Sequence, residues 1–236
     1  MSIDAVSIKR YIVGCGGVSE GGRGLGVGRT PRRRRKPEEA ERAILAAARS
    51  FLEERPFREM TVEGVMARTG LSRPAFYAYF QDRYELVTRL LEGFGGLLFA
   101  VDRRWLAGGG GREEAVEALI FALWRGSETF VRYGPVLRAI ADAASQDPRV
   151  EEVYRFGLIE RLVEAVASRI SRDVKAGISP ADLDPEETAR ALVLLTERYL
   201  LDAFGRPEGR PSPERTAAVI GTLEKVWLRT LYGLEA

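Results

Sequence analysis

The sequence predicts an all-α protein of about nine helices, and two observations carry this prediction. No sustained run of alternating β-branched and polar residues bounded by turns occurs in the 236 residues. Helix starts recur instead, because Asp147-Pro148, Asp184-Pro185 and Ser212-Pro213 each place a capping side chain before a first-turn proline, with acidic residues following. A chain of this length can bury a sizeable core, so it has room for two helical parts.

Residues 1–36 are predicted to form a flexible, glycine-rich and basic arm. They hold nine Lys and Arg residues against two acidic ones, a net charge of +7 that leaves −5 for the rest of the chain. The basic run ends in Arg34, Arg35 and Lys36, directly before the first predicted helix, where a mobile arm could follow a nucleic-acid backbone. The alternative is a solvated tail. The glycine-rich stretch 21–28 lacks the Gly-Lys-Ser/Thr of a phosphate-binding loop and is interpreted as linker.

The first helix is expected to end at Glu53-Glu54-Arg55-Pro56. Its apolar residues follow a helical period: Ala40, Ile44, Ala47, Ala48, Phe51 and Leu52. After it, residues 61–86 are interpreted as two short helices around a Gly-Leu-Ser turn. Thr61 would cap the first of the two and Gly70 would end it. Ser72 would open the second, with Pro74 in its first turn, where no backbone donor is lost.

The second short helix has one apolar face and one exposed face. Phe76 and Phe80 lie four residues apart and are expected to be buried together, which leaves Arg73, Tyr77 and Tyr79 facing outward. A short helix of this kind, held against a second helix by a tight turn, has the size to enter a major groove. The alternative is an ordinary helical bundle in which the two tyrosines are half-buried.

Asp82 and Glu85 are spaced as a capping box that begins a long helix. Apolar residues continue that helix towards Leu106: Leu86, Leu90, Leu91, Phe94 and Leu97. Later breaks between helices are expected at residues 108–111, 133–135 and 177–180.

Ser72–Phe80, followed by Asp82–Leu86, resembles the signature of the TetR (tetracycline-repressor-type) family of regulators. Ala191–Arg198 and Val226–Gly233 are similar to segments of its mycobacterial ethionamide-resistance subfamily. The resemblance implies a helix-turn-helix DNA-binding domain over residues 37–86 and a ligand-binding and dimerisation domain over residues 87–236. It also implies a homodimeric repressor that binds an operator in double-stranded DNA and is released by a hydrophobic small-molecule effector.

Carried over by motif, the DNA contacts fall on the two short helices and the start of the next one: Thr61, Ser72, Arg73, Pro74, Ala75, Tyr77, Tyr79 and Arg83. The arm residues Arg34, Arg35 and Lys36 are added for their charge and position. Arg73 is the candidate for reading bases, because a guanidinium can bond a guanine edge in bidentate fashion. Tyr77, Tyr79 and Arg83 are expected to contact phosphates.

The resemblance further implies a long, mostly apolar ligand tunnel, lined here by Thr196, Glu197 and Trp227. Large aromatic residues on the body helices add three further candidates, which are plain core residues in the alternative interpretation: Phe121, Trp124 and Phe156.

The subfamily places ligand-bonding asparagines where this chain has Val193 and Thr196, so the ligand is not transferable and is expected to be more apolar.

The last two helices carry wide apolar faces, and a homodimer through these helices is expected to cover them. The residues concerned are Leu192, Val193, Leu195, Tyr199, Leu200 and Phe204, and then Val219, Ile220, Leu223, Val226, Trp227 and Leu231.

Composition argues against other classes of protein. The chain has no histidine, which removes the commonest general base and the commonest zinc ligand, so neither an enzyme nor a metal site or cofactor is expected. The single Cys15 excludes an intramolecular disulfide, and no apolar run is long enough for a membrane span. A cytoplasmic protein is expected. The alternative function is a helical lipid-binding or small-molecule-binding protein with a vestigial DNA-binding head.

Overall fold

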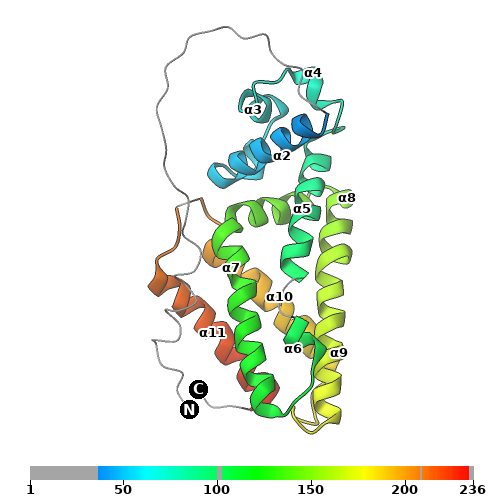
Figure 1. Cartoon of the computed structure of the whole chain (residues 1–236), viewed down its shortest axis with the longest axis vertical. Coiled ribbons are helices and arrows are strands. Elements are labelled where there is room, and N and C mark those ends of the chain that lie inside the picture. Colours follow the sequence, from blue (N-terminus) through cyan, green and yellow to red (C-terminus); the bar gives the residue numbers. More distant parts are fainter. Residues whose placement is uncertain (1–36, 100–102, 208, 234–236) are drawn as a thin grey trace. The chain divides into compact units, whose positions relative to one another are not determined.

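The computed structural model describes residues 37–99, 103–207 and 209–233, and every regular element in these ranges is helical (Figure 1). These residues belong to one compact unit, Lys36–Ala236. The described part of the chain contains nine helices when the uninterrupted run from Pro148 to Lys175 is counted as one. The prediction of an all-α fold of about nine helices is therefore confirmed. The predicted arm contacts Arg34, Arg35 and Lys36 lie outside the described residues.

The first helices form the head, with bounds α2 (Pro37–Glu54), the single 3-10 turn η1 (Phe57–Glu59), α3 (Val62–Ala67) and α4 (Arg73–Phe76). The six apolar residues predicted for the inner face of α2 are all buried. Thr61 caps α3, since its Oγ1 accepts a hydrogen bond of 3.0 Å from the backbone N–H of Gly64. Gly70 has φ of +68°, a left-handed conformation that favours glycine and turns the chain between α3 and α4.

Helix α5 (Arg83–Phe99) begins at the predicted acidic cap. Asp82 Oδ1 accepts hydrogen bonds from the backbone N–H groups of Tyr84 (2.8 Å) and Glu85 (2.9 Å). Glu85 Oε2 reaches back to the backbone N–H of Gln81 at 2.6 Å, one residue earlier than a standard capping box would place it. The start of α5 is thus held by two carboxylates.

The body consists of α6 (Arg103–Ala107), α7 (Arg112–Ala144), α8 (Pro148–Glu151), the π-helical segment η2 (Glu152–Glu160), α9 (Arg161–Lys175), α10 (Pro185–Phe204) and α11 (Pro213–Tyr232). The three capped starts predicted from sequence are confirmed. Asp147, Asp184 and Ser212 each accept a hydrogen bond from a first-turn backbone N–H, at 2.9, 2.9 and 3.2 Å. None of the described helices is long and apolar enough to span a membrane.

The break predicted at residues 133–135 is a kink within α7. Only Tyr133 leaves helical geometry, with φ of −128° and ψ of 15°, and the helix then resumes through Pro135. A proline removes one intrahelical hydrogen bond, and packing can compensate for that loss. Helices α2, α5, α10 and α11 all contact α7, so tertiary packing holds the two halves of the helix in one element.

The apolar faces of the last two helices are mostly covered within this chain, which corrects the reasoning from sequence. Of the twelve residues assigned to a dimer interface, nine are buried: Leu192, Val193, Leu200, Phe204, Val219, Ile220, Leu223, Trp227 and Leu231. All of them except Ile220 belong to the two apolar cores that also include residues of α7 and α9. Leu195 stays 44% exposed, as does its neighbour Leu194. Dimerisation therefore stays a prediction that rests on the resemblance and on this smaller exposed surface.

Candidate nucleic-acid interface and ligand cavity

Helix α4 presents the surface expected of a DNA-reading helix. Phe76 and Phe80 are buried and their rings pack against each other, with centroids 5.5 Å apart. This contact turns the opposite face of α4 towards solvent. On that face Ser72, Arg73 and Pro74 are exposed and Ala75 is half-buried. The residues proposed to enter the groove therefore share one accessible surface. Sequence alone predicted this arrangement because the two phenylalanines are four residues apart.

Arg73 is held at this surface by two neighbours. Its Nη1 lies 2.6 Å from Glu63 Oε1 on α3, and its Nη2 donates a hydrogen bond of 3.4 Å to the Tyr77 hydroxyl. The bond to Tyr77 and the charge of Glu63 raise the pKa of Arg73, so it stays protonated. The pair is solvent-exposed and worth little to stability, so Glu63 can be exchanged for a DNA group at small cost.

The expected phosphate contacts differ in accessibility. Tyr77 is 51% exposed, as expected. The expectation that Tyr79 also faces outward is wrong, because Tyr79 is half-buried and packs against the core of the head. Arg83 Nη1 donates to the carbonyl of Met60 at 3.0 Å, and its guanidinium lies over the ring of Phe57 at 4.7 Å. Of the three, Tyr77 is best placed to reach a backbone, while Arg83 also joins the start of α5 to the turn before α3.

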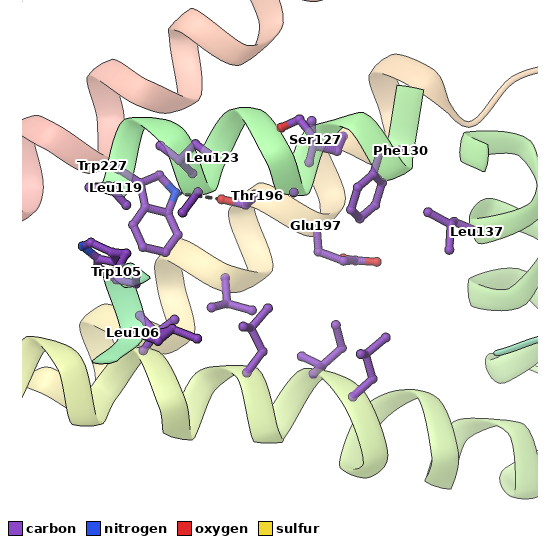
Figure 2. Close-up of a pocket in the computed structure, with 18 of the residues that line it drawn as sticks. Trp105, Leu106, Leu119, Leu123, Ser127, Phe130, Leu137, Thr196, Glu197 and Trp227 are labelled. Carbon is purple, nitrogen blue, oxygen red and sulfur yellow. Dashed lines mark hydrogen bonds between the residues drawn. The ribbon is translucent and has the colours of Figure 1, made fainter. Parts of the chain in front are cut away.

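A cavity of about 120 Å³ lies in the body between α6, α7, η2, α9, α10 and α11 (Figure 2). Its size is comparable to that of an engineered apolar cavity of roughly 150 Å³ that binds benzene. Nineteen described residues line it: Trp105, Leu106, Leu119, Ala122, Leu123, Gly126, Ser127, Phe130, Leu137, Tyr154, Leu158, Ile159, Leu162, Val166, Val193, Thr196, Glu197, Leu200 and Trp227. The three residues assigned to the tunnel by motif, Thr196, Glu197 and Trp227, are among them.

Two polar pairs interrupt the apolar wall. Trp227 Nε1 donates a hydrogen bond of 2.8 Å to Thr196 Oγ1 (Figure 2). The Tyr154 hydroxyl donates to Glu197 Oε1 at 2.5 Å. Burial and the adjacent Glu197 carboxylate raise the pKa of the Tyr154 hydroxyl far above its ordinary value, so it remains a donor.

The three aromatic residues chosen by composition do not line the cavity. Phe121 and Phe156 are 36% and 60% exposed, and Trp124 Nε1 donates to Glu224 Oε2 at 3.3 Å. The reason is helical phase, because α7 turns Leu119, Ala122, Leu123, Gly126 and Phe130 towards the cavity and leaves Phe121 and Trp124 on other faces.

Trp105 forms one end of the cavity, and sequence reasoning did not identify it. Its ring meets that of Trp227 edge to face, with centroids 5.8 Å apart. Its Nε1 donates to the Tyr232 hydroxyl at 3.1 Å, and that hydroxyl donates to Asp173 Oδ2 at 3.2 Å. The buried Arg169 bonds Asp173 at 2.8 Å and also donates to the carbonyl of Trp105. Trp227 and Tyr232 lie in the segment Val226–Gly233 that resembles the family, but no sequence motif marks Trp105, Arg169 or Asp173, and the five residues meet only in the folded chain.

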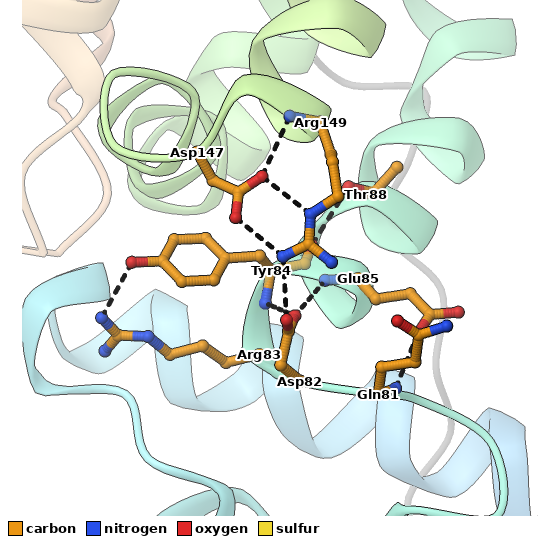
Figure 3. A network of polar contacts seen from close by, with 8 residues as sticks. All are labelled: Gln81, Asp82, Arg83, Tyr84, Glu85, Thr88, Asp147 and Arg149. Carbon is orange, nitrogen blue, oxygen red and sulfur yellow. Dashed lines mark hydrogen bonds and ion pairs between the residues drawn. The ribbon is translucent and has the colours of Figure 1, made fainter.

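The head and the body share an apolar core, and contacts of Arg149 and Arg49 also join them. Arg149, at the start of α8, bonds Asp147 at 2.7 Å and Asp82 at 2.8 Å (Figure 3). Burial alone would raise the pKa of Asp82, but the bonds from Arg149 and from the backbone at the start of α5 lower it, so the carboxylate is charged. A second contact joins α2 to α7, where the Arg49 guanidinium lies 4.8 Å from the ring centroid of Tyr133 at the kink.

Comparison with protein families gives two matches along the chain. Residues 44–90 match the family described as bacterial regulatory proteins, tetR family. Residues 120–233 match the C-terminal domain of the transcriptional regulator EthR. The chain is 30% identical over 217 residues to the HTH-type transcriptional regulator EthR of Mycolicibacterium smegmatis, covering 87% of this chain and 94% of that one. It is 30% identical to EthR of Mycobacterium tuberculosis over 202 residues, which is 83% of this chain and 88% of that relative.

Solved structures with the same fold include GusR of Salmonella enterica and the TetR-family regulator PfmR of Thermus thermophilus. GusR has a TM-score of 0.63 at 19% identity and covers 84% of this chain and 98% of its own. PfmR has a TM-score of 0.63 at 22% identity and covers 83% of this chain and all of its own. These likenesses concern the fold.

Proposed function

Since the chain belongs to the TetR family of bacterial regulatory proteins, we propose that it represses transcription by occupying an operator in double-stranded DNA as a homodimer. The observation that carries this proposal is the exposed surface formed by Ser72, Arg73, Pro74 and Tyr77. The buried pair Phe76 and Phe80 holds this surface outward. Residues 37–86 act as the DNA-binding head and residues 87–236 as the ligand-binding and dimerisation body. A repressor of this kind works in the bacterial cytoplasm, where its operator lies.

A hydrophobic small molecule in the cavity releases the repressor from DNA. Helical segments that line the cavity also connect to the head. Phe130 and Leu137 of α7 lie on either side of Tyr133, which contacts Arg49, and η2 directly follows α8, which carries Arg149. A ligand that widens the cavity favours one arrangement of these segments over another. It can shift the heads only to the extent that it binds the two arrangements with different affinity.

Arg73→Ala is expected to reduce discrimination between operator and random DNA by about 10-fold to 100-fold, because one bidentate base contact is worth roughly 1–3 kcal/mol. Tyr77→Phe is expected to weaken binding to both DNAs alike, since a lost phosphate contact carries no sequence information. The measurement is a titration against DNA from upstream of the protein's own gene, with random DNA as competitor, at two salt concentrations.

Unchanged affinity and specificity in both variants would refute these assignments. The native protein could instead bind both DNAs equally and release both when salt is added. Its DNA binding would then be electrostatic and independent of sequence. That outcome would favour a lipid-binding protein with a vestigial head.

Arg149→Gln is expected to lower operator affinity about 5-fold while the melting temperature stays within about 2 °C. The exposed bridge to Asp82 contributes little to global stability, but it fixes the start of α5 relative to α8. Arg155→Gln is the matched control, because Arg155 makes a similar exposed pair with Glu151 that does not involve the head. Equal operator affinity in the two variants would show that the bridge does not position the head.

A further inference from the structure

The cavity contains one formal charge. Among the nineteen described residues that line it, Glu197 is the one carboxylate side chain, and no lysine or arginine is present. Within the described part of the chain, Glu197 forms no ion pair. Figure 2 shows its side chain extending from α10 into the space enclosed by the lining residues. A single carboxylate therefore lies in a wall that is otherwise uncharged and mostly apolar, with Ser127 and Thr196 as its hydroxyl residues.

The polar groups nearby compensate this charge only in part. Tyr154 donates to Oε1, and in the described residues no hydrogen bond reaches Oε2. In the other polar pair on the wall, the Trp227 indole donates to the Thr196 hydroxyl, so that neither group is bonded to Glu197. One oxygen of the carboxylate is consequently left to whatever fills the cavity.

A ligand that fills the cavity displaces water from Glu197. A hydrocarbon would leave the carboxylate with one hydrogen bond in an apolar enclosure, and desolvating an ionised group without a partner is costly. A carboxylate or phosphate ligand would add repulsion between like charges. An ammonium group would instead donate to Oε2 and neutralise the charge, and such charge-assisted hydrogen bonds are among the strongest in proteins.

We propose that the effector is an amphiphilic organic cation, a protonated amine on an apolar body, whose ammonium group bonds Glu197. Its apolar part lies against the aliphatic and aromatic residues of the wall. Phe130 and Tyr154 also line the cavity, and aromatic rings attract a cation rather than an anion. This inference rests on the proposed function in one respect, that the cavity is the effector site.

The test compares three probes with the same eight-carbon tail: octylammonium, octan-1-ol and octanoate. Each is titrated into the native full-length chain by calorimetry, with the fluorescence of the cavity tryptophans as a second readout. Octylammonium is expected to bind at least 10-fold more tightly than octan-1-ol, and octanoate is expected to bind most weakly. Equal affinity of amine and alcohol, or a preference for octanoate, would overturn the proposal without any variant being made.

Glu197→Gln is expected to weaken octylammonium at least 10-fold and to leave octan-1-ol within about 3-fold, because the side chain keeps its size and loses its charge. Glu224→Gln is the matched control. Glu224 is also a half-buried glutamate that accepts a hydrogen bond from an aromatic side chain, but it lies outside the cavity. Its variant should keep the preference for the amine. If both variants lost that preference equally, the effect would not belong to Glu197.

These measurements contain no DNA, so they separate the two proposals. Selective binding of the amine by a protein that fails to recognise any operator would support the ligand class and refute the repressor. Operator binding by a protein without selectivity for the amine would support the repressor and refute the ligand class.

Discussion

Gly134→Ala is expected to destabilise the protein by about 2–4 kcal/mol, against the trend for a helical glycine. In an open helix the change would be favourable by roughly 1 kcal/mol, since alanine has the higher helix propensity. At this position an added Cβ would lie 2.1 Å from the carbonyl oxygen of Phe204 and 2.6 Å from its carbonyl carbon. Both atoms belong to the backbone of α10, so α7 and α10 would have to move apart.

Gly93→Ala in α5 is the control for this prediction, because nothing lies within 4 Å of the Cβ it would add. It is expected to leave stability unchanged or to raise it by up to about 1 kcal/mol. Urea unfolding of the two variants provides the comparison. A Gly134→Ala variant as stable as Gly93→Ala would mean that α7 and α10 do not approach as closely as described.

The close approach at Gly134 has a consequence for the cavity. Phe130 and Leu137 on α7 and Leu200 on α10 line it, and all three lie within about a turn of the contact between Gly134 and Phe204. Separating the two helices should therefore change the space available to a ligand as well as the free energy of unfolding.

Local signals in the sequence predicted the helices well. Each capped start corresponds to a side chain that bonds a backbone N–H of its own first turn, as at Asp147 and Ser212, so the information lies within four residues. The sequence predicted a break at Tyr133 because a Gly-Pro pair usually ends a helix. What keeps α7 continuous is contact with helices far away in sequence, and no local rule reports such contacts.

The DNA-binding surface and the cavity also differ in how far local sequence predicts them. The exposed face of α4 follows from a single helical period, so Arg73 and Tyr77 were placed correctly on the surface from spacing alone. The cavity is assembled from six segments, and a residue lines it only if the phase of its helix is right. Resemblance identified Thr196, Glu197 and Trp227, whereas composition chose Phe121 and Trp124, which lie on other faces of α7.

Asp173→Ala is expected to destabilise the protein by about 3–5 kcal/mol, because it leaves a buried arginine without its counter-charge. The side chains of Arg169 and Asp173 are 2% and 6% exposed, and their atoms approach to 2.8 Å. Arg169 Nη2 is already buried without a hydrogen-bond partner in the described structure, so no nearby group is ready to replace the carboxylate. Urea unfolding measures the loss.

Glu41→Ala provides the contrast, because it removes a carboxylate that pairs at 2.8 Å with the exposed Arg89 on α5. That pair is expected to contribute no more than about 1 kcal/mol. Comparable losses in the two variants would contradict the argument that burial sets the size of the effect.

The Asp173 carboxylate is also linked by hydrogen bonds, through Tyr232, to Trp105 in the wall of the cavity. Burial raises the pKa of the Tyr232 hydroxyl to about 12, so it stays protonated and donates to Asp173 while accepting from Trp105. Asp173→Ala should therefore loosen Trp105, which closes one end of the cavity against Trp227. Asp173→Asn keeps an acceptor for Tyr232 but lacks the charge that Arg169 requires. If stability fell in both variants but the indole environment changed only in Asp173→Ala, the charge would hold the fold and the hydrogen bond would hold the cavity wall.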